Sequence, residues 1–152
     1  MDTKEIFDRE YNRIYRIALL YLKNSADAED AAQTIFLKYL EKNISFKNEE
    51  HEKAWFITAA KNHCKDILKS FWNKNVELGE IPEQKNENEG KELISLVLKL
   101  PDKYSEVLYL YYYEGYKAKE ISKIMSIKES TVQTRLYDGR KKLKKILEKE
   151  GL

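Results

Sequence analysis

Apolar residues recur at every third or fourth position along most of the chain, which is the spacing of one face of an α-helix. No segment sustains the alternation of polar and apolar residues that is typical of a strand. We therefore expect an all-α protein. The periodicity fails in residues 73–90, where two glycines, a proline and an excess of acids have the composition of a linker. The sequence thus predicts two small helical domains, residues 1–72 and 91–152, joined by a flexible acidic linker.

The periodic segments are bounded by residues that start or stop helices. Ser25 is expected to cap the second helix, Pro101 breaks one helix from the next, and Gly115 is a good C-terminal stop. The expected helices span about Thr3–Lys23, Ser25–Lys42, His51–Trp72, Lys91–Leu100, Asp102–Tyr113, Ala118–Met125 and Ser130–Lys149.

The charge distribution separates the two predicted domains. The formal net charge is +2, but residues 1–69 sum to zero, with 12 Lys/Arg and 12 Asp/Glu. Residues 70–92 carry 3 cations against 6 acids, and residues 93–152 carry 13 against 8, which leaves the C-terminal part at +5. This charge is typical of a domain that binds a polyanion.

Several classes of function are disfavoured by what the chain lacks. Cys64 is the only cysteine, so no internal disulfide and no cysteine-based zinc site can form. His63 and Cys64 are adjacent on a helix and point about 100° apart, the wrong geometry for a nucleophile and its base. We expect no catalytic residue, metal, cofactor or small-molecule substrate. No apolar run reaches the ~20 residues that span a bilayer, and no signal-peptide pattern is present, so a cytoplasmic protein without direct membrane insertion is expected.

The pattern that says most about function lies near the C-terminus. A short helix (Ala118–Met125), a break at 126–129 and a long helix from Ser130 have the spacing of a helix-turn-helix. At about 100° per residue, Val132 and Leu136 begin a buried stripe on the long helix. The positions opposite or beside that stripe are polar, aromatic or basic: Gln133, Thr134, Arg135, Tyr137, Asp138, Arg140, Lys141, Lys142 and Lys145. This arrangement suits a DNA-reading helix, and the alternative is a solvated basic helix in a bundle.

In a helix that enters the major groove, polar and aromatic groups reach base edges and cations hold phosphates. The expected base contacts are Gln133, Thr134 and Tyr137. The expected phosphate contacts are Arg135, Arg140, Lys141 and Lys144. Asp138 has two interpretations: it accepts a hydrogen bond from a cytosine amino group, or it pairs with Arg135, Lys141 or Lys142 on its own helix. We favour the internal pair.

At this point the residues resemble a known family. The segment LPDKYSEVLYLYYYEGYKAKEISKIMSIKESTVQTRLYDGRKKL resembles the promoter −35-reading domain of sigma-70 family RNA polymerase sigma factors. DAEDAAQTIFLKYL and AWFITAAKNHCKDILK resemble the domain that binds core polymerase and opens the −10 element. With only these two domains, the chain resembles an extracytoplasmic-function (ECF) sigma factor. The resemblance implies core RNA polymerase and promoter DNA as partners, and an anti-sigma factor as a regulator.

The resemblance also assigns residues in the N-terminal domain. Asp30 and Gln33 match positions that bind the clamp coiled coil of the polymerase β′ subunit, and Leu37 falls on the same predicted helix face. Asn62 matches the asparagine at the pocket for a flipped −10 base, where an amide can pair with a base edge. The nearby cations expected to hold the DNA strand are Lys61, Lys65 and Lys69. Trp55 has two interpretations, stacking on a base or packing between helices, and we favour packing.

In the C-terminal domain the resemblance places the tyrosine-rich segment 109–116 near the contact with the polymerase β flap. The helical pattern there predicts a core stripe of Tyr104, Val107, Leu108 and Tyr111, and surface positions at Tyr112, Tyr113 and Tyr116. Three departures from the family pattern concern the helix-turn-helix. Lys117 and Lys128 replace capping Ser or Thr, and Ser126 replaces a turn glycine and is expected to be left-handed. Asp138 and Gly139 stand where relatives often carry Arg and Ala.

Two other functions remain to be weighed. One is a helix-turn-helix transcriptional regulator whose N-terminal domain binds a protein or dimerises. The other is a pure interaction module that binds polymerase or sequesters a sigma factor, and the predicted Asn62 face argues against it.

Overall fold

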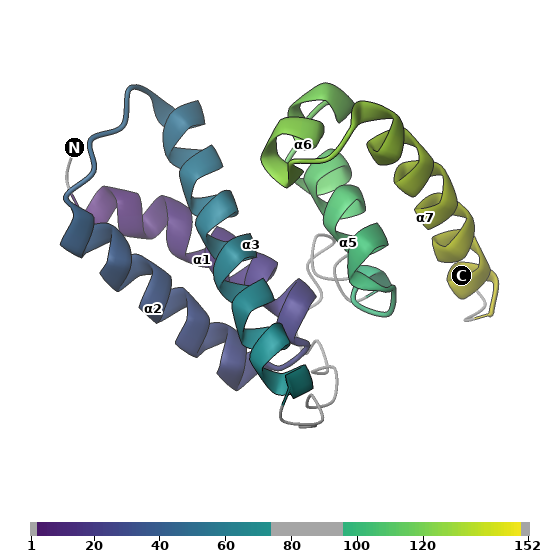
Figure 1. Cartoon of the computed structure of the whole chain (residues 1–152), viewed down its shortest axis with the longest axis horizontal. Coiled ribbons are helices and arrows are strands. Elements are labelled where there is room, and N and C mark those ends of the chain that lie inside the picture. Colours follow the sequence, from purple (N-terminus) through teal and green to yellow (C-terminus); the bar gives the residue numbers. More distant parts are fainter. Residues whose placement is uncertain (1–2, 74–95, 150–152) are drawn as a thin grey trace. The chain divides into compact units, whose positions relative to one another are not determined.

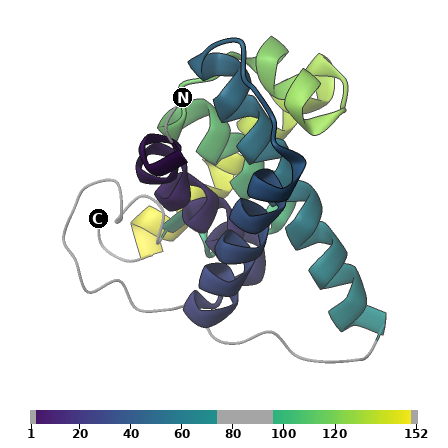
Figure 2. The ribbon, with the colours of Figure 1, turned by 90° about the vertical axis from the view of Figure 1, so that its left-hand side faces the viewer.

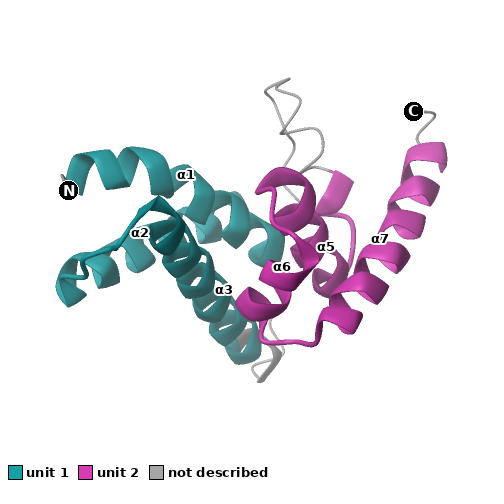
Figure 3. Ribbon diagram, turned by 90° about the horizontal axis from the view of Figure 1, so that it is seen from above, with its two compact units in different colours: residues 1–82 teal, residues 83–152 magenta. Residues whose placement is uncertain are grey.

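The computed structural model describes residues 3–73 and 96–149, and every regular element in those ranges is a helix. The chain divides into two compact units, Met1–Pro82 and Glu83–Leu152 (Figure 3). The all-α prediction is therefore confirmed. The predicted linker and the start of the helix expected from Lys91 fall almost entirely outside the described residues.

The N-terminal unit is built from three helices, α1 (Thr3–Leu22), α2 (Ser25–Lys42) and α3 (Glu49–Asn73). Each helix packs against the other two (Figures 1 and 2). The predicted bounds agree with these to within two residues. The predicted cap of α2 is wrong: Asn24, not Ser25, is the N-cap, and its side-chain oxygen accepts a hydrogen bond from the Asp27 backbone N–H at 2.9 Å. The Ser25 hydroxyl lies 2.9 Å from that of Tyr15 instead.

The core of this unit is formed by apolar residues at helical spacing. On α2 the buried face comprises Ala28, Ala32, Ile35, Phe36 and Tyr39. On α3 it includes Ile57, Ala60, Cys64 and Leu68. Phe7 lies at the margin of this core, because its side chain is 40% exposed and its ring stands nearly perpendicular to that of Phe36, with 5.1 Å between ring centroids.

An aromatic cluster joins the end of α2 to the start of α3. The Trp55 ring lies 4.9 Å from that of Phe56 and about 6.0 Å from those of Tyr39 and Phe46. The predicted packing role of Trp55 is therefore confirmed. Phe46 comes from the segment between α2 and α3, so the cluster also anchors that connection.

Two carboxyl groups are buried where α1 meets α3. Glu10 on α1 is 1% exposed and Glu52 on α3 is fully buried. Arg9 donates two hydrogen bonds to Glu52, from Nη2 at 2.8 Å and from Nε at 3.1 Å. Arg13 donates to Glu10, and the two carboxyl groups are themselves hydrogen-bonded. Each buried acid therefore has an arginine, which makes its burial tolerable.

The C-terminal unit begins with α5 (Asp102–Leu108), which runs into a π-helical turn, η1 (Tyr109–Tyr113). Two helices follow, α6 (Ala118–Met125) and α7 (Glu129–Lys149). The long helix α7 packs against both α5 and α6 (Figure 1). Gly139 permits the close approach of α7 to α5, because a Cβ at this position would lie 3.1 Å from Leu108 Cδ1.

The π-helical turn alters the predicted distribution of tyrosines. Its hydrogen bonds reach five residues back, as in the bond from the Glu114 N–H to the Tyr109 carbonyl at 3.1 Å. The side chains beyond Leu108 therefore leave the register of an α-helix. Tyr111, predicted in the core, is 37% exposed, whereas Tyr116, predicted on the surface, is 6% exposed. Gly115 then ends the segment with φ +78°, as predicted for a C-terminal stop.

The helix-turn-helix forms although Lys117 stands at a capping position and Ser126 at the position of the turn glycine. Lys117 provides no side-chain cap, but the Glu120 carboxylate accepts a hydrogen bond from the Lys117 N–H at 2.9 Å. Ser126 ends α6 in the left-handed conformation, with φ 57° and ψ 44°. That prediction is confirmed, and the sharp turn brings α7 across α6 after only three residues.

Candidate nucleic-acid interface and docking faces

The outer face of α7 carries the residues predicted to read DNA. Val132, Leu136 and Gly139 are buried and fix the inner face of the helix. Most of the predicted contact residues are exposed: Gln133, Thr134, Tyr137, Arg140, Lys141 and Lys144. Arg135 is half-buried. The structure therefore brings the predicted base-facing and phosphate-facing residues together on one side of one helix.

Aromatic rings order the cations on this helix. The Arg140 guanidinium lies 5.5 Å from the ring centroids of both Tyr111 and Tyr112. The ammonium of Lys141 lies 4.4 Å from the Tyr137 ring. Contacts of this kind attract a cation to the face of the ring while leaving its outer side open to an anion.

A further aromatic ring, that of Tyr104 on α5, lies beside the other flank of α7. The Lys103 and Lys142 ammonium groups lie 5.0 and 5.4 Å from its centroid. The sequence did not predict a role for Lys103, because nothing in the pattern of α7 indicates which residue of α5 lies next to it.

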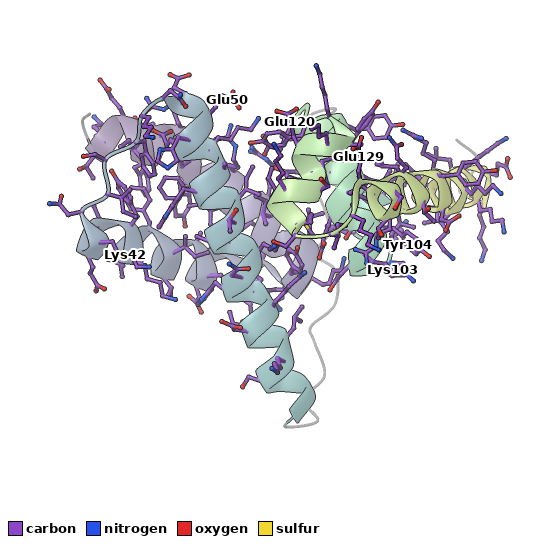
Figure 4. All side chains as sticks on the ribbon, turned by 45° about the horizontal axis from the view of Figure 1, so that its top comes forward. Lys42, Glu50, Lys103, Tyr104, Glu120 and Glu129 are labelled. Atoms are coloured by element: carbon purple, nitrogen blue, oxygen red, sulfur yellow. The ribbon has the colours of Figure 1, made fainter. Side chains whose placement is uncertain are left out.

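Lys103 and Tyr104, both labelled in Figure 4, also line a polar pocket of about 320 Å³ between α5 and the first half of α7. The α7 side chains around it are Ser130, Thr131, Thr134, Arg135 and Asp138. Hydroxyl groups, two cations and one carboxylate therefore converge on the base-facing half of the helix. Such a set can both donate to and accept from base edges or phosphate oxygens.

The internal ion pair favoured for Asp138 is not formed. Among the described residues, Asp138 forms no ion pair or hydrogen bond with another side chain. Its side chain is half-buried in the wall of the pocket instead. The carboxylate is thus free to accept a hydrogen bond from a ligand.

The predicted polymerase-docking residues lie on the exposed face of α2. Asp30, Gln33 and Leu37 are all exposed, and Leu37 has 59% of its surface accessible. Leu40, one turn further along, is 45% exposed and extends the face. Sequence analysis missed Leu40, although its spacing of three residues from Leu37 was visible. An exposed pair of leucines flanked by a carboxylate and an amide is suited to protein docking.

The predicted −10-binding residues lie along α3 with one exception. Asn62, Lys65 and Lys69 are exposed. Lys61 is 7% exposed, so the structure does not support its predicted contact with the DNA backbone. The reason is its helical position, since Lys61 directly follows Ala60 and precedes Cys64 by three residues on the buried side of α3.

His63 lies on the flank of α3 that faces α2. Its Nδ1 is 3.5 Å from the Lys38 ammonium. Burial and the Lys38 charge lower the pKa of His63 below its usual value, so the ring is held neutral near physiological pH.

Among the described residues there is no group of three or more potential metal ligands, and no helix there is long and apolar enough to cross a membrane.

Comparison with known proteins matches both units. The family model Sigma-70 region 2 matches residues 6–73, and the model Sigma-70, region 4 matches residues 90–143. The chain is 30% identical to RNA polymerase sigma factor SigV of Bacillus subtilis (strain 168), across 91% of this chain and 86% of SigV. It is 29% identical to ECF RNA polymerase sigma factor SigM of the same organism, across 95% and 94% of the two chains.

Two solved structures have a similar fold. One is the sigma factor RpoE in complex with the anti-sigma factor NepR from Bartonella quintana, with a TM-score of 0.78 and 18% identity over 95% of this chain and 96% of that one. The other is CnrH in complex with the cytosolic domain of CnrY, with a TM-score of 0.66 and 17% identity over 96% and 87% of the chains. At these identities the likeness is one of fold.

Proposed function

The chain belongs to the sigma-70 family of RNA polymerase sigma factors, in the ECF subfamily, and we propose how its two units divide the work of promoter recognition. As a sigma factor, it binds core RNA polymerase and promoter DNA and directs transcription initiation. It catalyses no reaction itself, because the polymerase carries out the chemistry. The match of residues 6–73 to region 2 disfavours the alternative of a simple helix-turn-helix regulator.

Within the N-terminal unit, the domain of residues 1–72 is proposed to hold polymerase and open the −10 element. The exposed face of α2, with Asp30, Gln33 and Leu37, would dock on the β′ clamp coiled coil. Leu40 widens the apolar part of that face. On α3, the Asn62 amide would pair with a base that has left the stack, while Lys65 and Lys69 hold the strand backbone.

Within the C-terminal unit, the domain of residues 91–152 is proposed to read the −35 element with α7 in the major groove. The observation that carries this proposal is the convergence of six exposed polar, aromatic and basic residues on the side of α7 opposite its buried stripe. Gln133, Thr134 and Tyr137 would face base edges. Arg135, Arg140, Lys141 and Lys144 would bind phosphates, with Lys103 of α5 added from the structure. The tyrosine-rich turn is proposed to lie near the polymerase β flap.

An anti-sigma factor is proposed as the regulator. The solved structures of similar fold are complexes with NepR and with the cytosolic domain of CnrY, and such a partner would compete with polymerase for an exposed face of this chain. We place the protein in the cytoplasm, where polymerase and promoters are found. Residues 73–90, which would link the two units, are long enough to let a partner hold them apart.

The decisive experiment is run-off transcription on genomic fragments with core polymerase, with and without the protein. We expect promoter-specific transcripts only when the protein is present. If the protein neither binds core polymerase nor directs a specific start, the proposed function is wrong.

Asn62→Ala separates the two tasks of the N-terminal unit. Because Asn62 is exposed, its loss leaves the helix packing intact and should lower promoter opening while core binding is unchanged. Opening is measured with a fluorescent base in the −10 element, and core binding by anisotropy of labelled protein. Equal loss of both would contradict the assignment.

A further inference from the structure

Among the described residues, Arg140 is the one cation of α7 whose side chain donates a hydrogen bond to another element. Its Nε donates to the Tyr112 hydroxyl at 2.5 Å, and the guanidinium lies 5.5 Å from the centroids of both Tyr111 and Tyr112. The two rings are themselves in edge-to-face contact, 5.0 Å apart. Lys144, one turn further along, is equally exposed and has no such contact among the described residues. From this difference we propose that Tyr112 is a positioning residue, which orders Arg140 for a phosphate of the −35 duplex.

The π-helical turn makes the arrangement possible. Tyr112 and Tyr111 are consecutive, yet both reach the same guanidinium on α7, 28 residues away in sequence from Tyr112. Both tyrosines are exposed, at 50% and 37%. Neither ring therefore belongs to the core, where burial alone would explain its position.

The chemistry of the contact leaves Arg140 free to bind an anion. A guanidinium has five N–H donors, and the Tyr112 hydroxyl takes the one on Nε. The N–H groups of Nη1 and Nη2 have no partner in the described part of the chain, and they form the fork that binds a phosphate in bidentate geometry. Tyr112 accepts as a neutral group, so the full positive charge of Arg140 remains available.

Ordering the side chain in advance strengthens binding. A free arginine side chain loses considerable rotamer freedom when it is fixed on a phosphate, and part of that loss has already occurred in Arg140. The contact changes the geometry of Arg140 but not the number of charges on the protein. It should therefore alter affinity without altering the number of counterions released from DNA.

This inference rests on the proposed function, because Arg140 must meet DNA for Tyr112 to matter. The test uses holoenzyme reconstituted from core polymerase and full-length protein, bound to a promoter fragment obtained in the run-off assay. Five variants are compared across a salt titration: the single variants Tyr112→Phe, Arg140→Gln and Lys144→Gln, and the two double variants that combine Tyr112→Phe with each of the others. Far-UV circular dichroism of each variant checks that the helices are intact.

We expect Tyr112→Phe to weaken binding roughly 3- to 10-fold with an unchanged salt slope. Arg140→Gln should weaken binding and reduce the slope by about 1, the value for one lost phosphate contact. In the Arg140→Gln background Tyr112→Phe should have no further effect, whereas in the Lys144→Gln background it should keep its full effect.

The two ideas fail in different ways. If Arg140→Gln changes neither affinity nor slope, the proposed phosphate contact of Arg140 is wrong, and the inference is overturned with it. If Arg140→Gln behaves as expected but Tyr112→Phe binds like the wild type, the inference alone is overturned. It is also overturned if Tyr112→Phe causes the same loss in both backgrounds, because its effect then does not pass through Arg140.

Discussion

The buried carboxyl pair of the N-terminal unit predicts an unusual dependence of stability on pH, which Glu10→Gln should remove. Glu10 is 1% exposed and hydrogen-bonded to the carboxyl group of Glu52. Burial, aided by that neighbouring acid, raises the pKa of Glu10 from 4.5 to about 7, even though Arg13 donates to it. The neutral acid is therefore the form that the fold favours, and glutamine has the same shape without the ionisation.

The sign of the effect follows from which state holds the proton. Between pH 4.5 and about 7 the folded chain keeps a proton on Glu10 that the unfolded chain has released, so stability falls as pH rises through this window. Since each pH unit between the two pKa values corresponds to about 1.4 kcal/mol, the wild type should lose about 3 kcal/mol of unfolding free energy. Glu10→Gln lacks this loss, so it should be the more stable protein above about pH 7.

Two other groups contribute to the pH dependence and must be separated from Glu10. Burial acts to raise the pKa of Glu52, but the hydrogen bonds from Arg9 and Glu10 outweigh it and lower the pKa, so its stabilisation is present above pH 4.5 and is lost below it. The lowered pKa of His63 makes stability rise with pH up to about 6.5. The Glu52 contribution is lost below pH 4.5, outside the window between pH 4.5 and about 7 in which Glu10 acts, and the His63 contribution is common to the wild type and the variant, so the difference between the two proteins in that window isolates Glu10.

The assay is urea unfolding of the full chain, followed by tryptophan fluorescence from about pH 5 to about pH 8. Both tryptophans, Trp55 and Trp72, belong to the N-terminal unit, so the signal reports on that unit alone. The difference in unfolding free energy between Glu10→Gln and the wild type should increase by about 3 kcal/mol across this range. A difference that stays constant with pH would refute the reasoning, because it would mean that Glu10 ionises normally in the folded protein.

Three further predictions concern the proposed binding faces and the helix turn. Leu37→Asp should weaken core polymerase binding about 10-fold, measured by anisotropy, with unfolding unchanged, because 59% of Leu37 is already exposed. Ser126→Gly should stabilise the C-terminal unit by about 1 kcal/mol, seen as slower amide exchange in α6 and α7, because it relieves a positive φ of 57°. Asp138→Ala should change the preferred base at one −35 position by about 1–3 kcal/mol in selection from randomised promoters, whereas a uniform gain in affinity for all sequences would indicate only relief of charge repulsion.

Helix positions were predictable here because each depends on local chemistry. The spacing of apolar residues placed α2 at the residues observed, and Gly115 and Ser126 were expected to take the positive φ values that they have. The misassigned cap of α2 shows the limit of this reasoning, since Asn24 and Ser25 are both good capping residues one position apart. Which of them faces the first turn depends on Tyr15 of α1, which lies beside the Ser25 hydroxyl.

The candidate site was predictable to the extent that it lies on single helices. The faces of α2 and α7 follow from about 100° per residue, so the exposure of Leu37 and Thr134 could be worked out directly. Lys61 shows that nearness in sequence is not enough, because it directly precedes Asn62 but lies on the buried side of α3. The burial of Lys61 leaves Lys65 and Lys69 as the exposed cations of that group.

What the sequence did not reveal are contacts between elements, and these decide how the cations of α7 behave. Seen on the helix alone, Arg140 and Lys144 are equivalent exposed charges. The π-helical turn cannot be predicted from the spacing of apolar residues. It brings Tyr112 to Arg140, whereas Lys144 has no partner among the described residues. The same packing of α5 on α7 adds Lys103 to the pocket wall and leaves Asp138 unpaired there. Promoter affinity and base preference should therefore respond to residues of α5 and η1, as well as to the recognition helix itself.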